Sequence, residues 1–97
     1  MYYVATFDPH VDGSGFYDVT FADLPGCVSQ GKSLDDALRM AAEAVSLHVG
    51  GMLEVGLALP SPSTPEQVRQ KDVEEAKKEG YELDDGILWQ YIQFEPV

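Results

Sequence analysis

The sequence lacks the features of a disulfide-stabilised or membrane protein. It has a single cysteine, Cys27, among 97 residues, so no internal disulfide can form and cysteine usage gives secretion no support. No stretch approaches the roughly 20 apolar residues of a membrane-spanning helix. The start, Met1–Asp8, has no basic segment followed by a long apolar one, and it indicates a strand rather than a signal peptide. We therefore expect a cytoplasmic protein that contacts no membrane.

Basic residues are also scarce. Lys and Arg number 6 against 17 Asp and Glu, which gives a formal charge of -11. Nucleic-acid affinity depends largely on neutralising phosphates with Lys and Arg, so we expect no direct binding of DNA or RNA, and a basic protein is the natural partner. The length predicts one small domain, residues 1–97.

The negative charge is unevenly distributed along the chain. Residues 1–31 hold four acids and residues 79–97 hold five, without any Lys or Arg in either segment, whereas residues 32–78 carry a net charge of -2. One interpretation is that these acids keep the sheet edges soluble and unpaired. The other is that they form a negative field that speeds capture of a basic protein. The sequence alone leaves both open.

Four segments have the alternating or β-branched and aromatic composition of strands. The second alternates most clearly, with Tyr17, Val19 and Phe21 on one face and Asp18 on the other. The last is apolar on both faces, which predicts burial on both sides. The expected strands are Tyr2–Asp8, Gly15–Phe21, Cys27–Gln30 and Ile87–Phe94.

A long helix is predicted to begin after Ser33. The Ser33 hydroxyl can cap the first free amides, and Asp36 can complete a pair resembling a capping box. One apolar stripe follows, and Gly50-Gly51 interrupts it, either for close packing or a fraying last turn, or for a subunit contact that needs a flat backbone. The stripe consists of Leu34, Ala37, Leu38, Ala41, Val45, Val49, Met52 and Leu53.

A second helix is predicted over Glu66–Glu79, after a stiff connector, Gly56–Pro65. Thr64 is its expected cap, with Pro65 at the first helical position and Gln67 returning the capping bond. The helix should end at Gly80 and be partly exposed, because its residues are highly charged. Together these elements predict an α+β fold with the order β-β-β-α-(α)-β. We expect a mixed four-stranded sheet in the order 3-2-1-4, with the long helix on one face and the last strand parallel to an earlier one through a right-handed crossover.

Candidate catalytic groups are few. Cys27 with His10 or His48 would form a thiol–imidazole pair, but Cys27 begins a strand where a small buried residue is needed. Asp8, Asp18 and Glu43 are conceivable ligands of a divalent metal, although their places on the predicted elements do not converge. We therefore expect no catalytic residue, no metal and no cofactor.

The segment Gly15–Ala37 carries the most specific pattern in the chain. A strand ends at Phe21, Asp23-Leu24-Pro25-Gly26-Cys27 follows, a short strand ends at Gly31, and Ser33 opens a helix with Leu, two acids and Ala. This pattern resembles the N-terminal domain of HicB-like antitoxins. The preceding hairpin and the segment Leu59–Ser63 are also similar, so the resemblance covers about residues 2–65 closely.

The resemblance implies a partial ribonuclease-H-like fold without that enzyme's metal site. Domains of this family neutralise a small basic HicA-type toxin, an mRNA-cleaving protein, by covering its active surface. Typical members also carry a C-terminal DNA-binding domain, whereas we expect residues 1–97 to form a single HicB-like domain without one. Either the sequence stops short of that domain or the protein is a stand-alone member. The charged segment Glu66–Asp85 is longer than is usual in the family, and the resemblance assigns it no role.

We therefore expect a non-catalytic antitoxin domain that occludes a basic toxin and forms a homo-oligomer, a dimer or a tetramer. Two alternatives stay open: a metal-dependent nuclease on a ribonuclease-H-like scaffold, which requires three carboxylates within about 5 Å of a common point, and an oligomeric binding module without a toxin. Each interface candidate equally fits a surface, edge-protecting or core role. The candidates are Phe16, Asp18, Asp84, Asp85, Trp89 and Tyr91.

Overall fold

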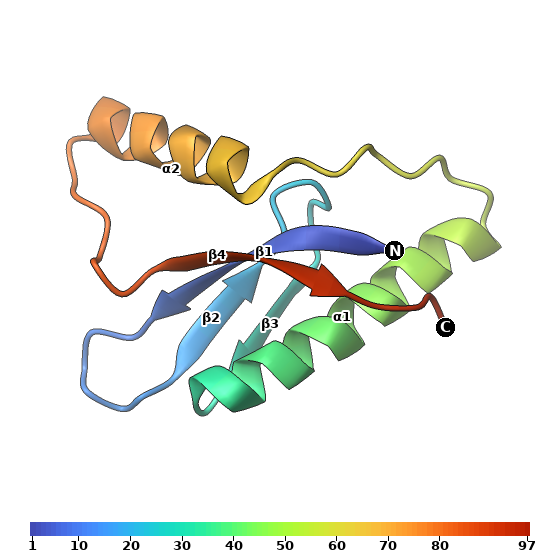
Figure 1. The fold of residues 1–97 in the computed structure, drawn as a ribbon, viewed down its shortest axis with the longest axis horizontal. Helices are drawn as coiled ribbons and strands as arrows, with labels where there is room; N and C mark the ends of the chain where they lie inside the picture. The colour runs from blue at the N-terminus through green and yellow to red at the C-terminus, as the bar shows by residue number, and fades with distance from the viewer.

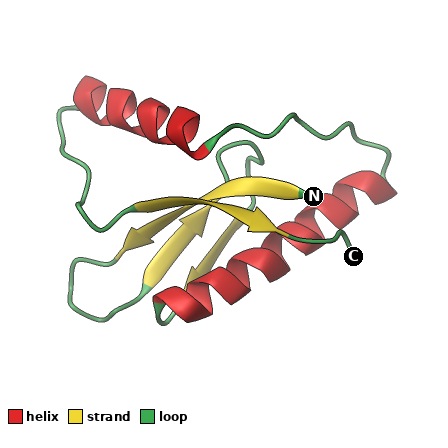
Figure 2. Cartoon of the chain, viewed as in Figure 1, coloured by secondary structure: helices red, strands yellow, loops and turns green.

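The computed structural model describes residues 1–97 and contains one four-stranded sheet with a helix on each face (Figures 1 and 2). The strands lie in the order β3-β2-β1-β4, which confirms the predicted order. Their ends differ from the predicted ones by up to two residues. The strands are β1 (Tyr2–Pro9), β2 (Tyr17–Thr20), β3 (Val28–Gly31) and β4 (Leu88–Gln93).

The prediction of a mixed sheet is wrong, because every neighbouring pair is antiparallel. A single helical crossover after β3 would have made β4 parallel to β1. The chain instead runs along the molecule twice between these strands, first as α1 (Leu34–Glu54) and then back through the connector and α2 (Pro65–Glu79). It therefore enters β4 from the opposite end (Figure 1).

The face of the sheet that α1 covers, here called the inner face, contains the main core. Tyr3, Ala5 and Phe7 of β1 point to this face, with Val19 of β2 beside them. The α1 residues that pack on them recur at helical spacing, as the stripe predicted. They are Ala37, Ala41, Val45 and Val49, all fully buried, whereas Leu53, which was included in the predicted stripe, is 47% exposed.

Helix α1 begins as predicted, at the Ser33 cap. The Ser33 hydroxyl accepts a hydrogen bond from the Asp36 amide at 3.2 Å, but the Asp36 carboxylate bonds to the amide of Lys32 at 2.9 Å rather than to that of Ser33. At the other end, the helix continues through Gly50 and Gly51. Gly50 is buried beside the backbone of Val97, with which a Cβ at this position would collide, and Gly51 faces open space. Close packing therefore accounts for Gly50.

Helix α2 lies on the opposite, outer face of the sheet (Figure 2). Thr64 and Gln67 form the predicted capping box, Pro65 occupies the first turn, and Gly80 ends the helix in a left-handed conformation. The helix buries Val68 and Ala76, and it is tied to β4 by a 2.8 Å hydrogen bond from Trp89 Nε1 to Asp72. Strand β4 is thus an edge strand that helices contact on both sides, but the predicted burial on both sides is wrong: Ile92 is buried, whereas Leu88 and Tyr91 are 39% and 41% exposed.

The connector between the helices is held against the sheet. The Asp23 carboxylate accepts hydrogen bonds from the amide and the hydroxyl of Ser63, both at 2.7 Å, and the Tyr3 hydroxyl donates to the carbonyl of Pro60 at 2.5 Å. These contacts fix the point at which α2 starts. Neither helix has the combination of length and apolar character needed to cross a bilayer.

Candidate protein-binding face

The outer face of the sheet concentrates carboxylates because of strand register. Asp8 of β1 lies directly opposite Asp18 of β2, and Thr6 lies opposite Thr20. Phe7 and Val19 point to the inner face. Since side chains alternate along a strand, Asp8, Asp18 and the two threonines point to the outer face. Gln30 of β3 is opposite Asp18 and extends the polar row. Like charges directly across an antiparallel pair are destabilising, so this arrangement is costly to the fold.

Helix α2 and the segment after it add to the same cluster. A hollow of about 300 Å³ lies between them and the sheet, and its lining contains four acids and no basic residue. Three apolar side chains form part of its wall, so the hollow offers both charge and hydrocarbon surface to a ligand. The lining residues are Thr6, Asp8, Asp18, Thr20, Asp72, Glu75, Tyr81, Leu83 and Ile87.

The electrostatic effect of the cluster is visible at Asp8. Its pKa is raised, chiefly because partial burial penalises the ionised carboxylate, and further by the negative charges of Asp18, Asp84 and Asp72. These carboxylates therefore share one local negative field. A cation that approached the face would relieve the repulsion between them.

A histidine sits at the hairpin end of this face. His10 Nε2 lies 3.1 Å from Asp18 Oδ1, and Gln30 donates to the same oxygen at 3.2 Å. The pKa of His10 is raised, first by the hydrogen bond to Asp18 and then by the charges of Asp18, Asp12 and Asp8. The Phe16 ring is tilted against the imidazole with its centre 5.9 Å away. Two predicted interface residues, Phe16 and Asp18, are thus joined through His10.

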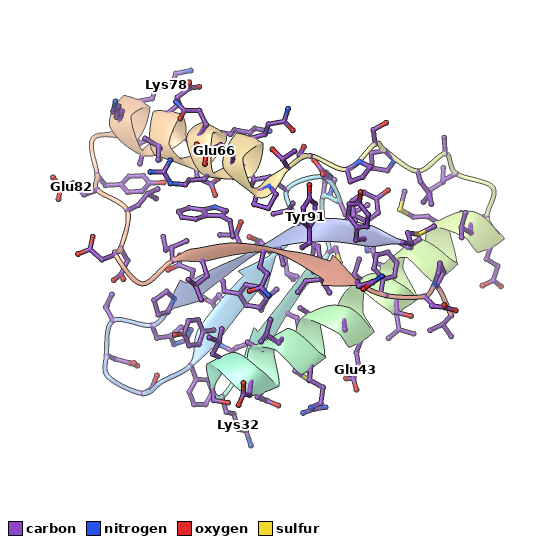
Figure 3. The ribbon with its side chains drawn as sticks, in the orientation of Figure 1. Lys32, Glu43, Glu66, Lys78, Glu82 and Tyr91 are labelled. Carbon is purple, nitrogen blue, oxygen red and sulfur yellow. The ribbon has the colours of Figure 1, made fainter.

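The other predicted residues also lie on the outer face or at its rim. Trp89 is half-buried and donates a hydrogen bond from its indole N–H to the Asp72 carboxylate. Tyr91 is 41% exposed and meets the Tyr2 ring edge to face at 4.7 Å, and Figure 3 shows it on the side of the sheet toward α2. In the turn before β4, the Asp84 carboxylate accepts a hydrogen bond from the Gly86 amide at 2.7 Å. Asp85 beside it is exposed.

Sequence reasoning missed part of this face. Asp8 was considered only as a metal ligand, although the β1–β2 hairpin pattern is enough to place it near Asp18. His10 was considered only for thiol and metal chemistry. Asp72 and Glu75 carry no sequence signal for the site, because only the docking of α2 brings them to the sheet.

The geometric condition for the metal-dependent alternative is not met. No group of three or more His, Cys, Asp or Glu side chains is placed to hold a metal ion. Asp8 and Asp18 are on the outer face, whereas Glu43 projects from α1 on the other side (Figure 3).

The thiol alternative also finds no support. Cys27 is buried, and burial raises the pKa of its thiol, which keeps it in the protonated form that is a poor nucleophile. His10 lies on the outer face beside Asp18, while Cys27 belongs to the core cluster beneath α1.

Sequence comparison identifies relatives that match a large part of the chain. Residues 3–82 match the family model described as a HicB-like antitoxin of bacterial toxin–antitoxin systems. An uncharacterised 14.9 kDa protein of Haemophilus phage HP1 is 45% identical over 51 residues, which are 53% of this chain and 38% of the phage protein. The chain thus spans well under half the length of that relative.

Solved structures agree with the sequence matches. The chain resembles a structure titled "HicA3 and HicB3 toxin-antitoxin complex" with a TM-score of 0.66 and 28% identity, over 99% of this chain and 100% of the matched chain. It also resembles the N-terminal domain of the Burkholderia pseudomallei antitoxin HicB, with a TM-score of 0.63 and 30% identity over 96% of both chains.

Proposed function

This chain belongs to the HicB-like antitoxin family, and we propose that it neutralises a small basic toxin by binding it on the outer face of the sheet. The family model covers residues 3–82, and one similar structure is a toxin–antitoxin complex. The observation that carries the proposal is the hollow that brings Asp8, Asp18, Asp72 and Glu75 together without a basic residue.

The physical argument is charge complementarity. A basic protein approaching this face is steered by the negative field, and the repulsion between Asp8 and Asp18 is relieved when a cationic side chain enters. Tyr2 and Tyr91 add exposed aromatic surface on the same side of the sheet, and aromatic residues supply much of the energy at interfaces.

We further propose that the partner is a HicA-type mRNA-cleaving protein and that its inhibition requires no catalysis by this chain. A cover laid over a ribonuclease surface needs only shape and charge, and the acidic face supplies the charge. On this proposal the chain works in the cytoplasm, where mRNA is found, and it influences RNA metabolism without binding RNA.

The test uses a small basic HicA-type protein as the candidate partner, sought first among the products of the genes adjacent to this one. It is co-expressed with the wild-type chain, and growth rescue and complex formation on a sizing column are measured. We expect rescue and a stable complex that weakens as salt rises, because salt screens exposed charges.

Two charge reversals of equal size locate the surface. Asp18→Lys removes a carboxylate from the outer face, and Glu54→Lys makes the same change at the far end of α1, where the side chain is exposed. We expect Asp18→Lys to weaken the complex at least about tenfold, or about 1.4 kcal/mol, and Glu54→Lys to leave it unchanged. No complex with the wild-type chain, or equal losses from both variants, would contradict the proposal.

A further inference from the structure

Helix α2 is anchored to the sheet by a much smaller apolar surface than α1. It buries two of its 15 residues, Val68 and Ala76, whereas α1 buries five of 21. Outside the main core, the buried apolar side chains are these two together with Val4 and Ile87. Regions with few buried apolar contacts open locally at a low cost in free energy. The small outer core therefore holds α2 weakly.

The polar contacts of α2 with the rest of the fold lie at its start and its middle. Asp23 accepts two hydrogen bonds from Ser63, just before the helix, and Trp89 donates one to Asp72. Residues 73–86 form no hydrogen bond with the sheet, and the loop after α2 returns around the end of the sheet to β4 (Figure 1). The start of α2 is thus fixed, and its second half is free to swing.

Like charges face each other across the acidic hollow, the one that Asp8, Asp18, Asp72 and Glu75 line. The first two are on the sheet and the last two are on α2. The negative charge of Asp72 helps to raise the pKa of Asp8, so helix and sheet repel one another where they meet. Protonated His10 offsets the charge of Asp18, 3.1 Å away. Asp8 and Asp72 are therefore the less compensated pair.

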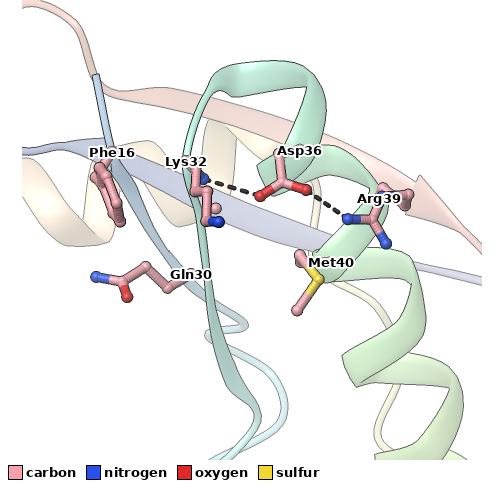
Figure 4. Close-up of a pocket in the computed structure, with 7 residues that line it drawn as sticks. Phe16, Gln30, Lys32, Asp36, Arg39 and Met40 are labelled. Carbon is pink, nitrogen blue, oxygen red and sulfur yellow. Dashed lines mark hydrogen bonds and ion pairs between the residues drawn. The ribbon is translucent and has the colours of Figure 1, made fainter. Parts of the chain in front are cut away.

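None of the six basic residues of the chain lines this hollow. Lys71 and Lys78 border a hollow on the solvent side of α2, and Figure 3 shows Lys78 on the side away from the sheet. Lys32 and Arg39 border a separate hollow between β3 and the start of α1 (Figure 4), where Arg39 pairs with Asp36. Bases turned toward an acidic sheet would stabilise the contact, because opposite charges attract. Helix α2 turns acids toward it instead.

We propose that α2 is a lid, with its pivot near Ser63, that opens from the sheet part of the time in the free chain and closes when a cationic side chain enters the acidic hollow. A positive group between Asp8 and Asp72 attracts both, so it binds the closed state better than the open one. A ligand shifts a conformational equilibrium only through such a difference in affinity. The source of the cation, a basic protein, rests on the proposed function, whereas the opening of the lid does not.

Trp89 reports the position of the lid. It is the only tryptophan of the chain, and its indole N–H is bonded to the lid at Asp72. Opening exposes the indole ring to acrylamide, a neutral quencher of its fluorescence. Opening also exposes the amides of α2 to hydrogen exchange, because an undocked helix of 15 residues is only marginally stable in water.

The first test varies salt in the isolated chain, without any partner. Raising NaCl from about 0.01 M to about 1 M shortens the Debye length from about 30 Å to about 3 Å and so screens the repulsion. We expect the quenching of Trp89 to fall and amide exchange in α2 to slow by at least about twofold relative to α1, the scale of one like-charge pair. No change, or faster exchange at high salt, would overturn the lid.

Two substitutions should move the lid in opposite directions. Asp8→Asn removes a charge from the sheet, and we expect α2 to exchange at least about twofold more slowly at low salt. Trp89→Phe removes the N–H bonded to Asp72, and we expect exchange in α2 at least about fivefold faster, because a hydrogen bond to a carboxylate is lost. Glu54→Gln, at an exposed acid at the end of α1, is the matched control and should leave α2 unchanged. Equal effects of Asp8→Asn and Glu54→Gln would contradict the coupling of charge to the lid.

The closing step is tested with tetra-arginine amide, a cationic peptide, added to the isolated chain at constant ionic strength. We expect the peptide to reduce the quenching of Trp89 and to slow exchange in α2, each by at least about twofold, and to have less effect on Asp8→Asn. Tetra-glutamate at the same ionic strength should do neither. A tetra-arginine peptide that changes neither reading, or a tetra-glutamate peptide that changes both equally, would overturn the closing.

The complex with the basic HicA-type protein separates this inference from the proposed function. Absence of a complex would contradict the proposed function, while the measurements on the isolated chain would still decide the lid. A complex in which α2 exchanges and Trp89 is quenched as in the free chain would overturn the closing of the lid and leave the proposed function intact.

Discussion

Asp23 accepts two hydrogen bonds from Ser63, one from its amide and one from its hydroxyl, each at 2.7 Å. The two residues are 40 positions apart, on opposite sides of α1 in the sequence. Asp23 belongs to the turn between β2 and β3, and Ser63 is the residue before the Thr64 cap of α2. This contact therefore links the β2–β3 turn to the start of α2, the helix that forms one wall of the acidic hollow.

Replacing Asp23 should loosen the start of α2. Asp23→Ala leaves the Ser63 amide and hydroxyl without their partner, and hydrogen bonds to charged groups contribute about 1.5–3 kcal/mol each. We expect a fall of about 2 kcal/mol in the free energy of unfolding, measured with urea, and faster amide exchange in α2 than in α1. Asp35→Ala, at an exposed acid in the first turn of α1, is the comparison. Equal exchange in both helices of the Asp23 variant would show that the contact does not hold α2.

Neighbouring glycines of α1 should respond in opposite directions to alanine. A Cβ at residue 51 meets nothing within 4 Å, so Gly51→Ala should stabilise the protein by about 0.5–1 kcal/mol, the helix preference of Ala over Gly. Gly50→Ala should destabilise it, because the new methyl would collide with the backbone of Val97. Thermal unfolding of both variants checks the signs, and a gain in stability from Gly50→Ala would refute the close packing.

Removing one carboxylate from the outer face should stabilise the fold and weaken partner binding. Asp8→Asn abolishes the repulsion of Asp18 across the strand pair, an effect of about 0.2–1 kcal/mol for a cross-strand pair. Because the folded state raises the pKa of Asp8, the ionised carboxylate opposes folding, and its unfavourable contribution disappears as pH falls through the folded-state pKa. Urea unfolding at neutral pH should therefore show a gain that shrinks in acid. A variant that is less stable than wild type at neutral pH would contradict this reasoning.

The imidazole of His10 should titrate above its ordinary range. Its hydrogen bond to Asp18 and the acids around it favour the protonated form. A group whose pKa is raised by folding stabilises the protein fully below the unfolded pKa, about 6.5 for histidine, and this contribution is lost as pH rises through the folded value. An NMR titration of the His10 ring should give a pKa above 6.5, and Asp18→Asn should lower it. An unchanged His10 titration in Asp18→Asn would show that Asp18 is not the cause.

Local signals in the sequence predicted the elements well. Ser33 and Thr64 cap helices where their spacing to Asp36 and Gln67 suggested, because capping depends on residues that are neighbours along the chain. The strand order 3-2-1-4 was also predicted correctly, although β4 lies at an edge and is not buried on both faces. The direction of β4 was not predicted correctly, because a periodic pattern states which face a strand buries and not from which end the chain enters it.

The candidate site was predictable only in part. Phe16 and Asp18 were chosen from the sequence, and His10, which joins them, was assigned to other chemistry. Trp89 was taken as an interface residue, but its indole N–H is occupied by Asp72. Such a pairing links a helix to a strand 17 residues away, and no spacing rule connects two residues across a loop of that length.

The sequence by itself determined the local elements, the uneven distribution of 17 acids and 6 bases, and the family pattern of Gly15–Ala37. Each depends on composition or on residues close together in the chain. Only the tertiary structure decided that α2 crosses the outer face, that Asp72 and Glu75 join Asp8 and Asp18 around one hollow, and that the β3 edge remains open. These relationships depend on how separate elements pack, because the free energy of packing comes from contacts between surfaces that are distant in sequence.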